Sequence, residues 1–152
     1  MGVFRMTNHY KQPISALIVI YTSALEVLLL ERADFPGFWQ SVTGSRDGDE
    51  TLLETASRET FEETGLSSKV FPLTDWQQQN VYDIYPTWVH RYPPGTTRNT
   101  EHVFGLELPQ PVPVTIAPRE HLSYQWVPWQ VAAEKVYSPS NRAAILQLPE
   151  KN

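Results

Sequence analysis

Cysteine is absent from the chain, so disulfide bonds and thiol chemistry are excluded. This absence permits a cytoplasmic location, which is the location we expect. The sequence holds no run of about 18 apolar residues, so it predicts no membrane-spanning helix. The N-terminus also lacks a basic stretch followed by an apolar one, so no secretory signal is expected.

A basic stripe is also missing, and the net charge is −5. This balance argues against a long nucleic acid as partner, because such binding depends on clustered lysine and arginine. A small phosphorylated substrate remains compatible, since a bound metal ion can supply positive charge locally. No repeat or linker divides the 152 residues, which predicts a single domain over 1–152, with 1–9 loosely ordered.

The order of apolar runs and turn signals predicts a mixed sheet covered by helices, an α/β (α+β) fold. The run at 14–21 is almost continuously apolar and β-branched, which is typical of a central strand buried on both faces. Further strands are expected at 26–32, 38–43, 69–73, 76–84, 101–108 and 123–127. Helices are expected at 51–64, 128–136 and 138–148.

The stretch from Gly44 to Leu66 is the most informative part of the sequence. It reads as a glycine-containing loop over 44–50, followed by the helix at 51–64. Thr51 and Glu54 form a capping box, in which each side chain satisfies a backbone N–H at the helix start. Gly65 stands where a helix favours a left-handed residue. One stripe of this helix is expected to face the core: Leu52, Leu53, Ala56 and Thr60.

Three glutamates crowd together near the end of this helix. Glu59, Glu62 and Glu63 stand at positions i, i+3 and i+4, where like charges repel. Acids at a helix C-terminus also oppose the helix dipole. The cluster is therefore either a solvated acidic face or a site for a divalent cation. Oxygen ligands without cysteine suit Mg²⁺, with Mn²⁺ as a possible substitute.

The same stretch resembles the Nudix box. Gly44 is followed after five residues by Glu50, and after seven more by Arg58-Glu59-x-x-Glu62-Glu63-x-Gly65-Leu66. All fixed positions match, whereas Thr60 stands where the family usually has a bulky apolar residue. The resemblance implies an α/β/α sandwich and a magnesium-dependent hydrolase acting on a phosphoanhydride.

The resemblance also assigns roles to the acids. Glu59 and Glu63, one helical turn apart, are expected to be metal ligands, and Glu62 to bind a second ion or orient a water. Glu120, in a proline-rich loop, is expected to complete the coordination or act as general base, because Nudix enzymes often add a distal glutamate from a late loop. His121 is expected to pack or hydrogen-bond rather than act as base.

Four positions of the box are expected to be structural. Arg58 should reach back to Glu50, which ties the loop to the helix and leaves Glu50 as a support rather than a ligand. Gly44 should leave the backbone open for close approach of a metal or phosphate. Gly65 should end the helix.

Outside the box, the chain is similar to the branch of the family that hydrolyses dihydroneopterin triphosphate. The similarity rests on the segments 38–45, 91–101 and 140–145. It implies release of pyrophosphate to leave the monophosphate, an early step of folate biosynthesis. Two alternatives stay open: a nucleoside triphosphate pyrophosphohydrolase that sanitises the nucleotide pool, and a non-catalytic, metabolite-sensing Nudix module.

A pterin or nucleotide triphosphate needs cations, hydroxyls and a flat apolar surface. The candidates for substrate binding are Lys11, Arg32, Thr43, Tyr82, Asp83, Ile84, Tyr85 and Ser138. Trp39 and Trp88 are further residues able to stack on a ring. The long connection at 86–99 is expected to be either a lid or an interface. The oligomeric state stays open.

Overall fold

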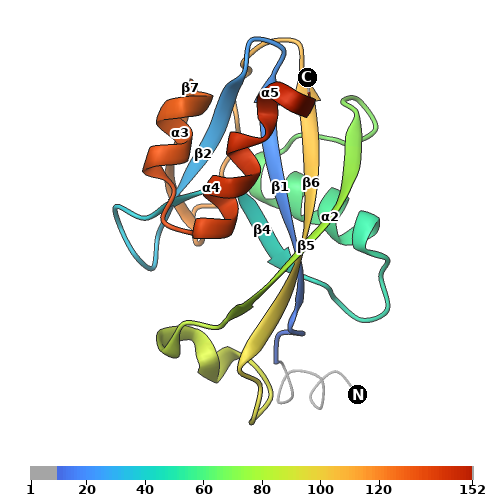
Figure 1. Ribbon diagram of the computed structural model, residues 1–152, viewed down its shortest axis with the longest axis vertical. Coiled ribbons are helices and arrows are strands. Elements are labelled where there is room, and N and C mark those ends of the chain that lie inside the picture. Colours follow the sequence, from blue (N-terminus) through green and yellow to red (C-terminus); the bar gives the residue numbers. More distant parts are fainter. Residues whose placement is uncertain (1–9, 152) are drawn as a thin grey trace.

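The computed structural model of the protein describes residues 10–151 (Figure 1). The expectation that 1–9 is loosely ordered lies outside the described residues. The strands are β1 (Ile14–Thr22), β2 (Glu26–Arg32), β3 (Trp39–Gln40), β4 (Val42–Ser45), β5 (Leu73–Asp83), β6 (Arg98–Leu108) and β7 (His121–Pro128). The helices are α2 (Leu52–Thr64), α3 (Trp129–Lys135), α4 (Pro139–Leu146), α5 (Leu148–Lys151) and a 3₁₀-helix, η1 (Pro86–Arg91). Within the described residues no helix is long and apolar enough to cross a membrane.

The strands form one mixed sheet in the order β3-β2-β1-β6-β5. β1 and β6 run parallel from Ile14 opposite Thr100 to Thr22 opposite Leu108, and the other pairs are antiparallel. β4 pairs with the first half of β1, whereas β7 pairs with β2. β1 is the central strand, as its apolar sequence predicts.

Successive residues of β1 point into two separate cores, because side chains alternate across a strand. Leu17 and Val19 pack in the core that α3, α4 and α5 cover. Ala16 and Ile18 pack in the other core, where Ala56 of α2 closes the layer. The predicted α/β/α sandwich is therefore confirmed, with helices on both faces of the sheet (Figure 1).

Two strand predictions were wrong in detail. The segment 69–73 is mostly a turn, because the N–H groups of Val70 and Phe71 both donate to the carbonyl of Ser67, and β5 begins only at Leu73. The segment 38–43 divides into β3 and β4. The break falls at Ser41, whose N–H donates to the Asn141 side chain at 2.9 Å instead of to a strand.

The helix of the Nudix-like box was predicted well, with one exception. The side chain and backbone of Thr51 and Glu54 complete the capping box, and Gly65 ends the helix with φ 77°. Ala56 and Thr60 are fully buried, but Leu53 is 52% exposed. Leu53 lies about 100° around the helix from its neighbour Leu52, which places it on the solvent side.

Candidate active site

A cavity of about 670 Å³ opens where the first residues of β1 and β6 meet β4 and η1. All eight residues predicted to bind substrate line it: Lys11, Arg32, Thr43, Tyr82, Asp83, Ile84, Tyr85 and Ser138. The wall also includes Gly44, Glu63 and Glu120. The fold thus gathers the box, the late loop and the flanking strands around one space, and the binding roles themselves stay predictions.

Arg58 is the electrostatic centre of the box. Its Nε and Nη2 donate to the two oxygens of Glu50 at 2.9 and 2.7 Å, a bidentate pair, and Nη2 also donates to the Ser45 carbonyl at 3.1 Å. Its Nη1 contacts Glu59 and Glu62, each at 3.2 Å. The hydrogen bonds from Arg58 lower the pKa of Glu50 to about 2. The geometry is the one expected of Glu50 as a support for the loop.

Glu59 and Glu63 face each other one turn apart on α2. Burial raises the pKa of Glu59, and burial together with the facing Glu59 carboxylate raises the pKa of Glu63 well above its usual range. Glu63 is 1% exposed, and its Oε1 has no hydrogen-bond partner. The nearest basic atom is His121 Nε2 at 3.7 Å, which is too far for a hydrogen bond. A buried carboxylate left in this state is unfavourable.

The donor set fits a divalent cation. Within residues 10–151, no group of three or more His, Cys, Asp or Glu side chains is already arranged so that it could hold a metal ion. The unpaired oxygen of Glu63 and its closeness to Glu59 are nevertheless the features that a cation would relieve. Carboxylate oxygens are the ligands that Mg²⁺ prefers. Glu120 lies in the same cavity and adds negative charge near both glutamates.

Gly44 is required by close packing against the box helix. It lies in β4 rather than in a loop, opposite Ala16 of β1. A Cβ atom at this position would stand 2.1 Å from the carboxylate of Glu59. Only glycine therefore allows the Glu59 carboxylate to pack directly against β4, beside the cavity-lining Gly44.

The remaining charged candidates and His121 lie in three different environments. Glu62 is outside the cavity wall and half exposed, and it contacts Arg58. His121 is buried, and burial lowers its pKa to about 4, so it is neutral at pH 7. Lys11 reaches the cavity, where desolvation and the Arg91 guanidinium lower its pKa, whereas Glu59 raises it.

Aromatic rings form one wall of the cavity. Tyr85 and Trp88 stack with ring centroids 5.1 Å apart and an interplanar angle of 6°. Tyr137 packs against both edge-on, and Arg32 lies 4.5 Å over the Trp88 ring. Asp34 holds Arg32 through two hydrogen bonds of 2.8 Å, so this guanidinium is fixed in the aromatic wall.

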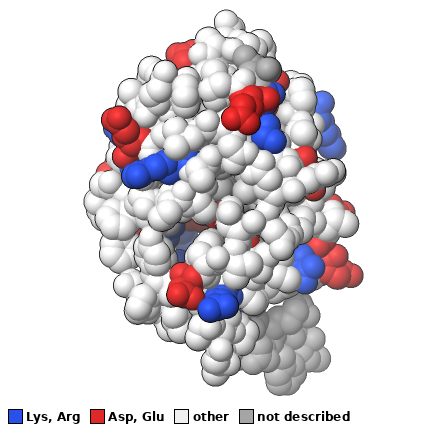
Figure 2. All heavy atoms as spheres, in the orientation of Figure 1, with Lys and Arg blue, Asp and Glu red and all other residues white. Residues whose placement is uncertain are grey.

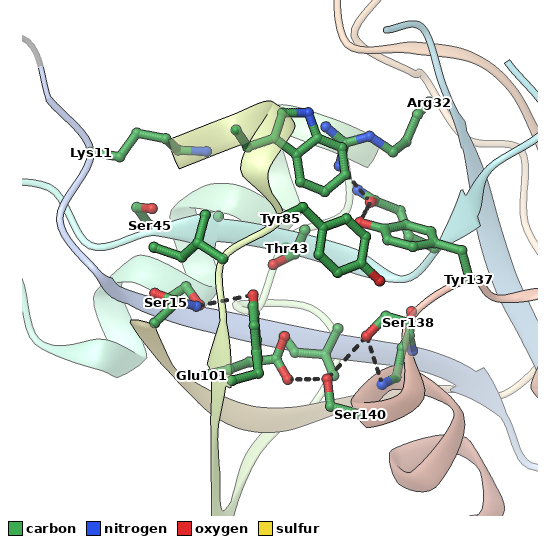
Figure 3. A pocket seen from close by; sticks show the side chains of 18 of the residues that line it. Lys11, Ser15, Arg32, Thr43, Ser45, Tyr85, Glu101, Tyr137, Ser138 and Ser140 are labelled. Carbon is green, nitrogen blue, oxygen red and sulfur yellow. Dashed lines mark hydrogen bonds between the residues drawn. The ribbon is translucent and has the colours of Figure 1, made fainter. Parts of the chain in front are cut away.

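Polar groups form the opposite wall, and among them Glu101, Asn99 and Ser140 were not predicted from the sequence to bind substrate. Glu101 of β6 is 4% exposed and accepts a hydrogen bond from Ser140 at 2.8 Å. Asn99, two residues earlier on the same face, donates to Ser15 at 2.7 Å. Figure 3 shows Glu101, Ser138 and Ser140 on one side of the cavity, with Tyr85 and Tyr137 on the other. The usable sequence signal was the strand alternation that puts Asn99 and Glu101 on one face.

The predicted connection at 86–99 contains η1, which brings Trp88 and Arg91 to the cavity wall. Arg91 also contacts Asp34 at 3.2 Å, and its carbonyl accepts from the N–H of Lys11 at 2.8 Å. Arg98 instead lies in β6, with an exposed side chain near Asp83. The first half of the connection therefore belongs to the cavity.

Comparison with known proteins agrees with this geometry. The family model of the NUDIX domain matches residues 11–148. The chain belongs to the Nudix family. Enzymes of this family typically use a divalent metal ion.

Two curated relatives share the same description. The chain is 43% identical over 141 residues to the dihydroneopterin triphosphate diphosphatase of Escherichia coli K12, covering 91% of this chain and 93% of that protein. It is 40% identical over 140 residues to the Haemophilus influenzae protein of that name, covering 90% and 87%. The solved structure of the E. coli dihydroneopterin triphosphate pyrophosphohydrolase superposes with a TM-score of 0.86 at 43% identity, over 91% of this chain and 95% of that one.

Proposed function

We propose that the protein hydrolyses dihydroneopterin triphosphate to the monophosphate and pyrophosphate. The observation that carries the proposal is a carboxylate pair, the buried Glu63 and the partly buried Glu59, beside a cavity with one aromatic wall. The pair suits a metal-bound triphosphate, and the stacked rings suit a flat heterocycle. The two curated relatives, similar over nearly their full length, support this substrate.

Glu59, Glu63 and Glu120 would hold Mg²⁺, with Mn²⁺ as a substitute. Such an ion neutralises phosphate oxygens and lowers the pKa of a bound water, so that a nucleophile is available near neutral pH. The anionic pair is then compensated, and the strongly raised pKa of Glu63 no longer opposes its ionised form. The proposed metal site thus explains why Glu59 and Glu63 lie so close together, an arrangement that is unfavourable without a cation.

The chain itself positions the reacting groups. Lys11 supplies positive charge at the cavity, where its ammonium would contact the phosphates. The Glu50–Arg58 pair anchors α2 to β4 and keeps Glu59 in place. Glu120, or Glu62 through a water, would accept the proton of the attacking water. Transfer of this kind needs mainly positioning and charge stabilisation.

The partner is a small molecule rather than a long nucleic acid. On the face seen in Figure 2, lysine and arginine are scattered among acidic side chains and form no continuous basic patch. The binding candidates instead converge on one cavity whose size suits a single small ligand. The cytoplasm remains the location that we predict.

A pyrophosphate-release assay with Mg²⁺ tests the proposal. The double variant Glu59→Gln, Glu63→Gln should lose at least about 1000-fold in kcat with dihydroneopterin triphosphate, because the proposed ligands lose their charge. Titration with Mn²⁺ should show weaker binding to the double variant. Glu134→Gln, at an exposed position of α3, serves as the matched control and should behave as the wild type.

Full activity of the double variant would remove the metal assignment. Absence of turnover by the wild-type protein, with Mg²⁺ or Mn²⁺ and any triphosphate, would instead favour the non-catalytic sensing module.

A further inference from the structure

Glu101 is a buried carboxylate that the proposed chemistry does not use. It lies in the cavity wall, 4% exposed, and it belongs to the central strand pair of the sheet. Within residues 10–151, no Lys, Arg or His side chain forms an ion pair with it. Burial of a carboxylate without a cation is costly, and two polar neighbours offset only part of that cost. These neighbours are Ser140, which donates at 2.8 Å, and Asn80, opposite on β5.

The position of Glu101 relative to the aromatic wall suggests what it contacts. Tyr85 and Tyr137 line the opposite side of the cavity in Figure 3, while Glu101 and Ser140 face the same space from below. A flat ring placed against the tyrosines would direct one edge toward the carboxylate. Ser140 occupies one oxygen of Glu101, and each carboxylate oxygen accepts more than one hydrogen bond, so acceptor capacity remains for a ligand.

A carboxylate has two acceptor oxygens and no donor, so it selects a ligand edge with two adjacent N–H groups. The 2-amino-4-oxopyrimidine ring has such an edge, formed by its ring N–H and its exocyclic amine. Pterins and guanine both contain this ring. Adenine instead places a nitrogen lone pair beside its amine, and the lone pair would face a carboxylate oxygen.

We infer that Glu101 is a specificity-determining residue, which reads the 2-amino-4-oxopyrimidine edge of a triphosphate substrate. The inference rests on the proposed function, because it assumes that this cavity holds the heterocycle of a hydrolysed triphosphate. It extends that function by assigning selectivity to a residue outside the Nudix box. Ser140 is the positioning residue, since its hydrogen bond fixes the carboxylate.

The first test needs no variant. Wild-type kcat/KM is measured with Mg²⁺ for dGTP, dITP and dATP, where dITP differs from dGTP only by the missing 2-amino group. One lost hydrogen bond to a charged acceptor corresponds to a decrease of about 10- to 100-fold, which is the expected ratio of dGTP to dITP. dATP should be at least as poor as dITP. Equal values for the three nucleotides would overturn the inference.

The second test is Glu101→Gln, with Glu107→Gln on the same strand but outside the cavity wall as matched control. The first variant should lose about 10- to 100-fold in kcat/KM for dGTP and dihydroneopterin triphosphate, with no loss for dATP. The control should keep the wild-type ratios. A uniform loss across all three substrates in Glu101→Gln would contradict edge reading.

The proposed substrate and the proposed role of Glu101 can be refuted independently of each other. If the wild type prefers a nucleotide to dihydroneopterin triphosphate, the proposed substrate is wrong, yet the ratio of dGTP to dITP still tests Glu101. If the wild type prefers the pterin and Glu101→Gln keeps all its selectivity, the substrate stands and the role of Glu101 is refuted.

Discussion

Glu50→Gln removes the charge that pairs with Arg58, and its effect on stability follows from the structure. The bidentate pair is partly shielded, with side-chain exposures of 17% for Glu50 and 28% for Arg58. The pKa of Glu50 falls from its ordinary 4.5 to about 2 on folding. A shift of this size is equivalent to about 3 kcal/mol of stability at pH 7. For a domain of this length it lowers the melting temperature by about 6–12 °C.

The effect has a defined dependence on pH. The folded-state pKa of Glu50 is lower than its unfolded value, so the unfolded chain binds more protons between the two. The stabilisation is fully present above about pH 4.5 and is lost as the pH falls toward about 2. The difference in unfolding free energy between wild type and Glu50→Gln should therefore stay constant from pH 7 to 5 and shrink below that.

Urea unfolding at a series of pH values measures this difference directly. A chelator in every sample removes any contribution from metal binding. The matched control is Glu134→Gln, an exposed residue of α3, which should unfold like the wild type at each pH. A loss of less than about 0.5 kcal/mol at pH 7, or a difference that does not change down to pH 3, would refute the reasoning.

Three further variants test other parts of the structure. Gly44→Ala should lower kcat about 100-fold with little change in melting temperature, because the alanine Cβ displaces the Glu59 carboxylate. Steady-state kinetics and thermal melting measure these two effects. Trp88→Ala removes the ring that stacks on Tyr85. This variant should raise the KM for dihydroneopterin triphosphate up to about tenfold and leave kcat nearly unchanged. A decrease in kcat without a change in KM would contradict a binding role for Trp88. Gly65→Ala forces a left-handed alanine at the end of α2 and should cost about 1 kcal/mol in urea unfolding, and an unchanged stability would contradict that geometry.

Structural features that form between residues close in the chain could be predicted from the sequence. The capping box, the end of α2 and the Arg58–Glu50 pair all follow from spacings within one loop and one helix. The central strand β1 follows from its apolar run, because a strand between two helical layers is buried on both faces.

The rest depends on contacts between distant segments. Glu101 reaches the cavity only because β6 pairs with both β1 and β5, and Ser140 meets it from α4. Strand alternation places Asn99 and Glu101 on one face of β6, but it does not tell whether that face lines a cavity or meets solvent. The break between β3 and β4 has the same origin, since Asn141 binds Ser41 across 100 residues of chain.

The central claim is the choice of substrate, and a comparison of kcat/KM tests it most directly. Purified wild-type protein is assayed for pyrophosphate release with Mg²⁺ on dihydroneopterin triphosphate, dATP and an oxidised dGTP. We predict that dihydroneopterin triphosphate gives a kcat/KM at least about tenfold above either nucleotide, as expected for the substrate proposed from the two relatives that are similar over nearly their full length. A far higher kcat/KM for either nucleotide would contradict the account and make the protein a nucleotide-pool enzyme.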